Sequence, residues 1–200
     1  MDDIDMDNEG TLPTPVPFSQ VFWGDESSVI PEESGSSDSS NWDSATSETQ
    51  LGTSARQHTA CLDVAAYVLR RLGPMSAMKL QKLVYYSQAW SLVWDEEPLF
   101  SEPVEAWANG PVVRRLFNHH RGHFRVDRLP AGNPRSLDDR ERETVDAVLD
   151  FYGKMSAQEL IDLSHSEKPW RDAREGLALT ERGNRKISQE AMAEYYSSLR

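Results

Sequence analysis

The sequence predicts a mainly α-helical fold, a compact bundle of about six helices with room for one short strand pair, preceded by a disordered acidic tail. From His58 onward, apolar residues recur at the spacing of helical faces, between capping residues and Gly or Pro. Before His58, Ser, Asp, Glu, Thr and Gly dominate, and this composition buries too little apolar surface to offset the entropy of ordering. We therefore expect a tail over residues 1–57 and a folded domain over residues 58–200.

The first two expected helices lie between residues 59 and 94. Apolar residues three and four apart form one face of the first helix, which Thr59 caps and Gly73-Pro74 ends. The second begins at Ser76. It is apolar over much of its circumference, so we expect it at the centre of the bundle.

The remaining helices are expected after an extended stretch over residues 99–107. A third helix starts at Gly110-Pro111, because Pro at the first helical position has no amide left unpaired. Residues 124–126 form a short strand or a loop, and a fourth helix covers residues 138–152. Ser156-Ala-Gln-Glu159 has the form of a capping box for a fifth helix, and Ser188 caps the last.

The charge is concentrated in the tail. Residues 1–57 contain twelve acidic residues and one basic residue, so they carry −11 of the net charge of −12. A nearly neutral domain has no basic footprint for a phosphate backbone, so nucleic acid is disfavoured as the main ligand. No apolar run is long enough to cross a membrane, and the N-terminus lacks the pattern of a secretory signal. The single cysteine, Cys61, fits a reducing compartment, so we expect a cytoplasmic protein.

Three groups of residues, read in order, resemble the Panacea domain of SocA-like antitoxins, a group that includes phage-associated proteins once called GepA. The first group is Met78-Lys-Leu-Gln-Lys-Leu-Val-Tyr-Tyr86 with Gln88-Ala-Trp90; the second is Val104-Glu-Ala-Trp107 with Gly110-Pro-Val-Val113; the third is residues 160–163 with Ser164-His-Ser-Glu-Lys-Pro-Trp170. The resemblance covers residues 59–200 and implies a mostly helical antitoxin domain that holds a cognate toxin inactive by direct contact. It implies no cofactor and no catalytic residues.

Most motif residues have a structural interpretation. We expect core or turn positions for Leu80, Leu83, Tyr85, Tyr86, Trp90, Trp107, Gly110, Pro111, His165, Pro169 and Trp170. Lys79 and Lys82 are three residues apart and therefore neighbours on one helix face. They either form a basic contact for an acidic partner, such as the toxin, or for the chain's own acidic tail, or they belong to a solvated face.

The tail contains one apolar island, residues 16–23, flanked by acidic residues. Such an island is typical of a short motif that orders on a partner, although it can also dock on its own domain or arise by chance. If the chain is an antitoxin, Phe18, Val21, Phe22 and Trp23 are the candidate toxin contacts of this segment, because aromatic side chains often dominate interface energetics.

Three catalytic or metal-binding interpretations are set aside. His119 and His123 are four apart, but the helix that carries them is expected to end near Gly122, and zinc needs three or four ligands. Ser164, His165 and Glu167 are nearly consecutive, whereas catalytic triads are assembled in space. Cys61 has no evident histidine partner. We therefore expect no metal, no cofactor and no enzyme.

The leading hypothesis is an antitoxin that masks a protein toxin, expected from the adjacent gene. The alternative is an adaptor or regulatory scaffold that delivers a partner protein to a protease. A hydrolase or nucleotide-modifying enzyme is a third hypothesis, for which the sequence nominates no catalytic residue.

Overall fold

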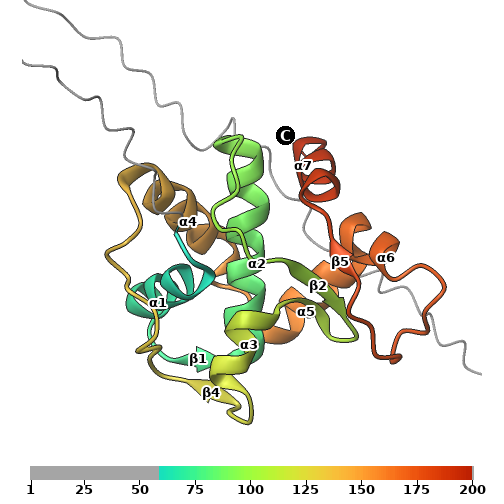
Figure 1. The fold of residues 1–200 in the computed structure, drawn as a ribbon, viewed down its shortest axis with the longest axis horizontal. Coiled ribbons are helices and arrows are strands. Elements are labelled where there is room, and N and C mark those ends of the chain that lie inside the picture. Colours follow the sequence, from blue (N-terminus) through green and yellow to red (C-terminus); the bar gives the residue numbers. More distant parts are fainter. Residues whose placement is uncertain (1–58, 200) are drawn as a thin grey trace, which may run out of the picture. The chain divides into compact units, whose positions relative to one another are not determined.

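The computed structural model describes residues 59–199, so the predicted tail and its island at residues 16–23 lie outside the described residues. Figure 1 shows the arrangement of the helices and strands. The helices are α1 (Cys61–Leu72), α2 (Ala77–Trp94), α3 (Arg114–His120), α4 (Asp139–Tyr152), α5 (Ala157–Ser166), α6 (Lys168–Ala173) and α7 (Gln189–Ser197). The strands are β1 (Met75–Ser76), β2 (Val104–Trp107), β3 (Gly110–Val113), β4 (Arg125–Val126) and β5 (Lys186–Ile187).

Helix α2 is the central element, as the sequence predicts. It contacts α1 and α4, and it also contacts α5, α7 and β3 (Figure 1). Every residue from 80 to 91 is buried, including the polar residues Gln81, Lys82, Ser87 and Gln88. Because buried polar groups are costly unless they are hydrogen-bonded, these side chains must find partners inside the fold.

The predicted bundle of about six helices with one short strand pair is wrong. Within residues 59–199 there are seven helices and two small antiparallel sheets, one of β1 and β4 and one with the strand order β3-β2-β5. The strands have two to four residues, too few to show an alternating apolar pattern. Strand β5 pairs with β2 through Val104↔Ile187, which lie far apart along the chain. Local sequence patterns carry no signal for such a pairing.

The third helix was also placed wrongly. Gly110 and Pro111 do not start a helix but form the first half of β3, and α3 begins at Arg114. Residues 104–107 and 110–113 form a β-hairpin with Trp107 opposite Gly110. The hairpin forms because Gly110 takes a positive φ of 97°, which favours glycine.

Capping residues mark most helix starts correctly. The Ser76 side chain accepts from Lys79 N at the start of α2, and Ser188 caps α7 in the same way. Ser156 and Glu159 form the predicted capping box of α5. Thr59 is an exception, since α1 starts after Ala60 and the Thr59 hydroxyl donates to Glu141 Oε2 at 2.8 Å.

A buried polar cluster joins α7 to the rest of the domain. Glu167, between α5 and α6, is 3% exposed, and its Oε2 accepts hydrogen bonds from the hydroxyls of Tyr196 at 2.6 Å and Tyr86 at 3.2 Å. The Tyr196 hydroxyl also lies 3.2 Å from that of Tyr85. The Tyr86 ring stacks on the Tyr152 ring at 4.1 Å between centroids. None of the described helices is both long and apolar enough to span a membrane.

Candidate functional site

The β2–β3 hairpin is attached to α2 by side chains of α2 that form hydrogen bonds with the backbone of the edge strand β3. Gln81 Oε1 accepts from Val113 N at 2.9 Å, and Gln81 Nε2 donates to Val113 O at 3.4 Å. Lys82 Nζ donates to Pro111 O at 3.0 Å. An open strand edge would present unpaired amides and carbonyls. The Gln81 and Lys82 side chains close this edge of β3, so two motif residues have a backbone-pairing role.

Lys82 lies beneath the turn of the hairpin and not on the surface. Its side chain is fully buried, and burial lowers its pKa to about 7. A Cβ added to Gly110 would lie 2.6 Å from Lys82 Nζ and 2.9 Å from Ser164 Oγ. Glycine is therefore required at position 110 both for its conformation and for space.

The expected pair of surface lysines is not found. Lys79 is half-buried and donates to Gly153 O at 2.7 Å, while Lys82 points under the hairpin. Neither the basic partner contact nor the solvated face describes Lys82, because its Nζ is enclosed by protein. The three-residue spacing correctly places Lys79 and Lys82 next to each other on α2. It does not predict which side of α2 the hairpin covers.

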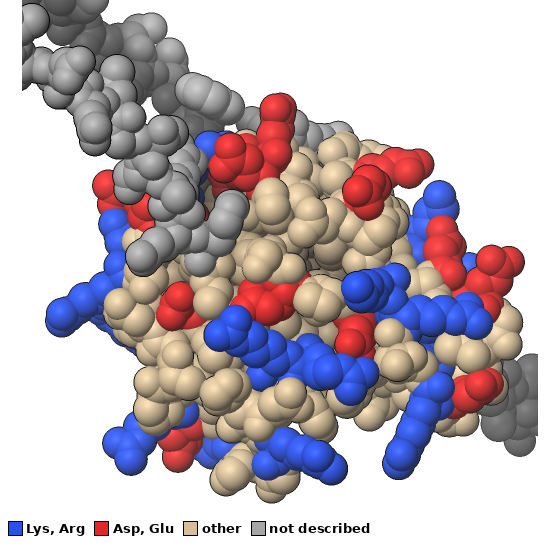
Figure 2. All heavy atoms as spheres, in the orientation of Figure 1, with Lys and Arg blue, Asp and Glu red and all other residues tan. Residues whose placement is uncertain are grey.

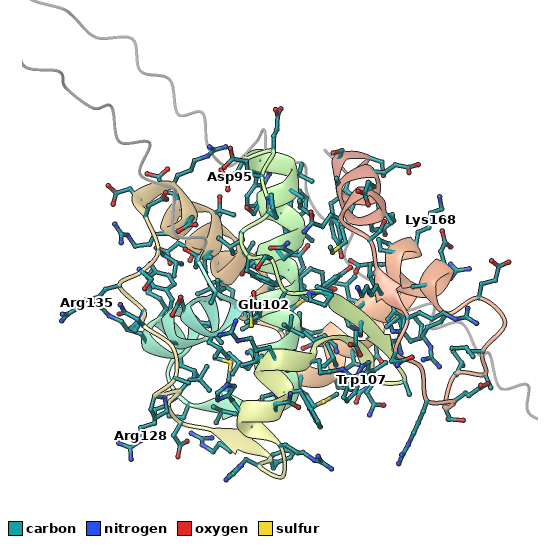
Figure 3. The ribbon with its side chains drawn as sticks, in the orientation of Figure 1. Asp95, Glu102, Trp107, Arg128, Arg135 and Lys168 are labelled. Atoms are coloured by element: carbon teal, nitrogen blue, oxygen red, sulfur yellow. The ribbon has the colours of Figure 1, made fainter. Side chains whose placement is uncertain are left out.

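Next to the hairpin lies a groove with a volume of about 1130 Å³, which we call the hairpin groove. It is lined by the end of the hairpin, the start of α2, the α3 helix with its following loop, His165, and residues 179, 180 and 182–184. Figure 3 labels Trp107, which lies at the hairpin end of this region. Among the lining residues, sequence reasoning named Trp107, His165 and Gln81 in the motif groups and His123 as a rejected metal ligand. It did not bring any of them together with residues 179–184.

The floor of the hairpin groove is aromatic and fixed in position. The rings of Trp107 and Phe117 meet edge to face with 4.8 Å between centroids. Arg114 lies over the Trp107 ring at 5.4 Å and forms a salt bridge with Glu105 at 2.6 Å. Glu105 Oε2 also accepts from Trp107 Nε1 at 2.8 Å, so one carboxylate orients both side chains. The arginine keeps the pKa of Glu105 below its usual value despite the opposing effect of burial.

The rims of the hairpin groove expose two large apolar side chains. Phe124 is 84% exposed and Leu179 is 73% exposed. Arg121 and Arg182 are exposed beside them. Both apolar residues lie in loops without helical or alternating periodicity, so the sequence offered no signal for them. Exposed apolar side chains around a hollow are typical of binding surfaces.

One wall of the groove contains His165. Its ring stacks on Trp170 at 4.1 Å between centroids, and Trp170 Nε1 donates to Trp107 O at 2.9 Å. The buried His165 Nε2 has no hydrogen-bond partner within residues 59–199. Burial lowers the pKa of His165, which favours the neutral imidazole. His165 and Trp170 therefore connect α5 and α6 to the hairpin.

The other motif residues lie in the core. Fully or nearly fully buried are Leu80, Leu83, Tyr85, Tyr86, Trp90, Pro169 and Trp170. The four tail residues proposed as toxin contacts, Phe18, Val21, Phe22 and Trp23, lie outside the described residues.

The groups considered for chemistry have separate surroundings. Ser164 Oγ donates to Ile161 O at 2.9 Å, while Glu167 faces the tyrosines and His165 faces Trp170. Burial raises the pKa of the Cys61 thiol, which lowers its reactivity. Within residues 59–199, no three His, Cys, Asp or Glu side chains are grouped so that they could hold a metal ion.

Comparison with known proteins shows what this chain is similar to. Residues 80–171 match the family described as Antitoxin SocA-like, Panacea domain. Antitoxin SocA of Caulobacter vibrioides (strain NA1000 / CB15N) is 33% identical over 112 residues, which cover 48% of this chain and 58% of that protein. No solved structure matches the chain. The comparisons confirm the resemblance seen in the sequence: residues 80–171 are similar to the SocA-like Panacea family.

Proposed function

We propose that this chain is the antitoxin of a toxin–antitoxin system and neutralises a cognate protein toxin by direct contact. The likeness to Antitoxin SocA carries the proposal. The hairpin groove supports it, because exposed apolar and basic side chains around a hollow suit a protein partner. The family likeness also suggests a regulatory role and not a catalytic one.

The proposal includes a division of the chain into an acidic segment, residues 1–57, and a domain from residue 58 onward. In this division Phe18, Val21, Phe22 and Trp23 provide a second toxin contact, steered by the surrounding acidic residues. Lys79 and Lys82 are left out of the contact, because the first binds Gly153 O and the second is buried. The expected site of action is the cytoplasm.

Purification together with the product of the adjacent gene tests the proposal. We expect the two proteins to co-elute. We also expect cells that produce only the neighbour to grow poorly, and cells that produce both proteins to grow normally. Loss of co-elution on removal of residues 1–57 would place a contact in the acidic segment. Absence of both the complex and the growth rescue would refute the antitoxin proposal.

The alternative, an adaptor that delivers a partner to a protease, is distinguished in the same cells. Masking predicts that the neighbour's half-life is unchanged or longer when this chain is present, because the complex is stable. Delivery predicts a shorter half-life that returns to normal when the protease is removed. A pulse-chase measurement of the neighbour therefore separates the two mechanisms.

A further inference from the structure

We propose that the hairpin groove is the docking site for an acidic segment of the partner protein that carries large apolar side chains. This inference rests on the proposed antitoxin function and adds the surface and the chemistry of the contact. Three properties of the groove lead to it: its size, its exposed apolar rims and its charge.

The size of the groove suits a polypeptide. Its volume of about 1130 Å³ exceeds the roughly 300–1,000 Å³ of typical small-molecule pockets. It lies between separate parts of the chain, the hairpin with α3 on one side and residues 179–184 on the other. A segment of another protein can therefore contact both sides at once, which a small metabolite would not need to do.

The rims supply apolar contacts that the fold itself leaves uncovered. Phe124 and Leu179 expose most of their surface, although a Leu or Phe side chain is stabilised by about 1.5–3 kcal/mol when it is fully buried. The floor beneath them contains Trp107 and Phe117, whose rings are already fixed against each other. A partner that inserts large apolar side chains would cover the rims and meet a rigid aromatic floor, the setting in which interface hot spots occur.

The charge of the groove selects an acidic partner. Its lining residues include Arg114, Arg121 and Arg182 and no Asp or Glu, in a chain whose net charge is −12. Within residues 59–199, neither Arg121 nor Arg182 forms an ion pair. Figure 2 shows Lys and Arg side chains, with some Asp and Glu between them, over the region where α3 and the hairpin lie in Figure 1. Carboxylates of a partner would find the guanidinium groups of Arg121 and Arg182 free to pair.

The same charge argues against a second copy of this chain as the occupant. In a two-fold dimer each patch meets its own copy, so the arginines of one groove would face those of the other. Like charges at an interface disfavour association. An acidic partner segment avoids this repulsion and pairs the arginines.

The test measures binding of the full-length chain to the purified product of the adjacent gene by isothermal titration calorimetry. The groove variant combines Leu179→Asp with Arg182→Glu. Its matched control combines Leu72→Asp with Arg135→Glu, which makes the same changes at exposed positions that do not line the groove. Figure 3 shows Arg135 on the side of the molecule away from Trp107.

We expect the groove variant to weaken binding at least tenfold, about the effect of losing one interface hot spot, and the control to stay within about twofold of the wild type. We also expect the wild-type affinity to fall as salt is raised, and to fall less steeply in the groove variant. Far-UV circular dichroism melts check that the groove variant and its control both fold. A second groove variant, Phe124→Ala at a highly exposed position, tests the apolar contact without a charge change.

Four results would overturn the inference. Wild-type affinity in both groove variants would show that the partner binds elsewhere, while the antitoxin proposal would stand. No binding by the wild type would refute the antitoxin proposal and this inference with it. Tighter partner binding after alanine replacement of Phe18, Phe22 and Trp23 would identify residues 16–23 as the occupant of the groove. A dimer in sedimentation that Leu179→Asp dissociates would identify a second copy.

Discussion

Lys82 on α2 and Glu167 between α5 and α6 are both buried, yet their surroundings differ. Glu167 accepts hydrogen bonds from the hydroxyls of Tyr86 and Tyr196, whereas Lys82 donates one to the carbonyl of Pro111. Burial raises the pKa of Glu167 to about 8 and lowers that of Lys82 to about 7. In each case the neutral form is favoured, because no opposite charge compensates for the loss of water. The comparison teaches that the fold can bury a base on α2 and an acid between α5 and α6, each held by neutral partners.

The two groups affect stability with opposite pH dependence. Because the fold raises the pKa of Glu167, its contribution to the free energy of unfolding is fully present below its ordinary pKa of 4.5. This contribution is lost as the pH rises through about 8. Lys82 has a lowered pKa, so its contribution is fully present above its ordinary pKa of 10.5 and is lost as the pH falls through about 7. Variants at these positions, and at the residues that enclose them, test the comparison.

Replacing Gly110 should break the Lys82 region and have the largest effect. Gly110→Ala places a Cβ 2.6 Å from Lys82 Nζ and strains a backbone with φ of 97°, so we expect a loss of more than about 3 kcal/mol in the free energy of unfolding. Gly122→Ala is the control, because Gly122 has φ of 83° but open space around its Cβ. Its loss should be about 1–2 kcal/mol, the cost of the conformation alone. Equal losses in urea unfolding would contradict the close packing of Lys82 under Gly110.

Glu167→Gln should remove the pH dependence of the tyrosine region. Between pH 5 and 8 the wild type loses stability relative to this variant, because unfolding releases the proton that buried Glu167 retains. We expect the difference to change by about 3 kcal/mol over this range, at about 1.4 kcal/mol for each pH unit over which only the folded state holds the proton. Urea unfolding of both proteins at several pH values measures it. A constant difference would mean that Glu167 is ionised in the fold.

Lys82→Met should remove the opposite dependence under the hairpin. Between pH 7 and 10 the wild type gains stability relative to the variant, because unfolding takes up a proton that buried Lys82 lacks. The expected change is again about 3 kcal/mol, because the pKa shift and the pH range are as large as for Glu167, and the same urea titrations measure it. Lys154→Met, at an exposed position, is the control and should show no such trend. A trend of the same sign as for Glu167 would refute the contrast between the two regions.

Tyr196→Phe should have the smallest effect. It removes the hydroxyl that donates to Glu167 Oε2 at 2.6 Å, so we expect a loss of about 1–2 kcal/mol. Tyr195→Phe is its neighbour on α7 and is half-buried outside the Glu167 cluster, so thermal unfolding should change little. A larger loss for Tyr195→Phe than for Tyr196→Phe would contradict the role assigned to the Tyr196 hydroxyl.

Several features of this fold could be read from local sequence. Ser76, Ser156 and Ser188 mark helix starts because a side-chain oxygen acts within the first helical turn, and the apolar circumference of α2 predicts its central position. The motif residues could also be grouped, and the resemblance they carry was confirmed by comparison. These signals depend on residues close together in the chain.

The hairpin and the groove could not be read in this way. Gly110-Pro111 is a reasonable helix start by local rules, but Gln81 and Lys82 pair with Val113 and Pro111 and keep the segment extended. The groove needs residues 179–184 beside the hairpin, and no local pattern links them. The burial of Lys82 follows from the same hairpin, which covers one side of α2.

By itself, the sequence determined where several helices begin, which helix is central, the concentration of acidic residues before His58 and the family resemblance. Each depends on composition or on neighbours within a few turns. Tertiary structure alone decided that Lys82 is a buried base, that Glu167 is a buried acid among tyrosines, and that Phe124, Leu179 and two unpaired arginines surround one groove. The reason is physical: burial and charge pairing depend on which distant segments meet, and that is a property of the packed chain.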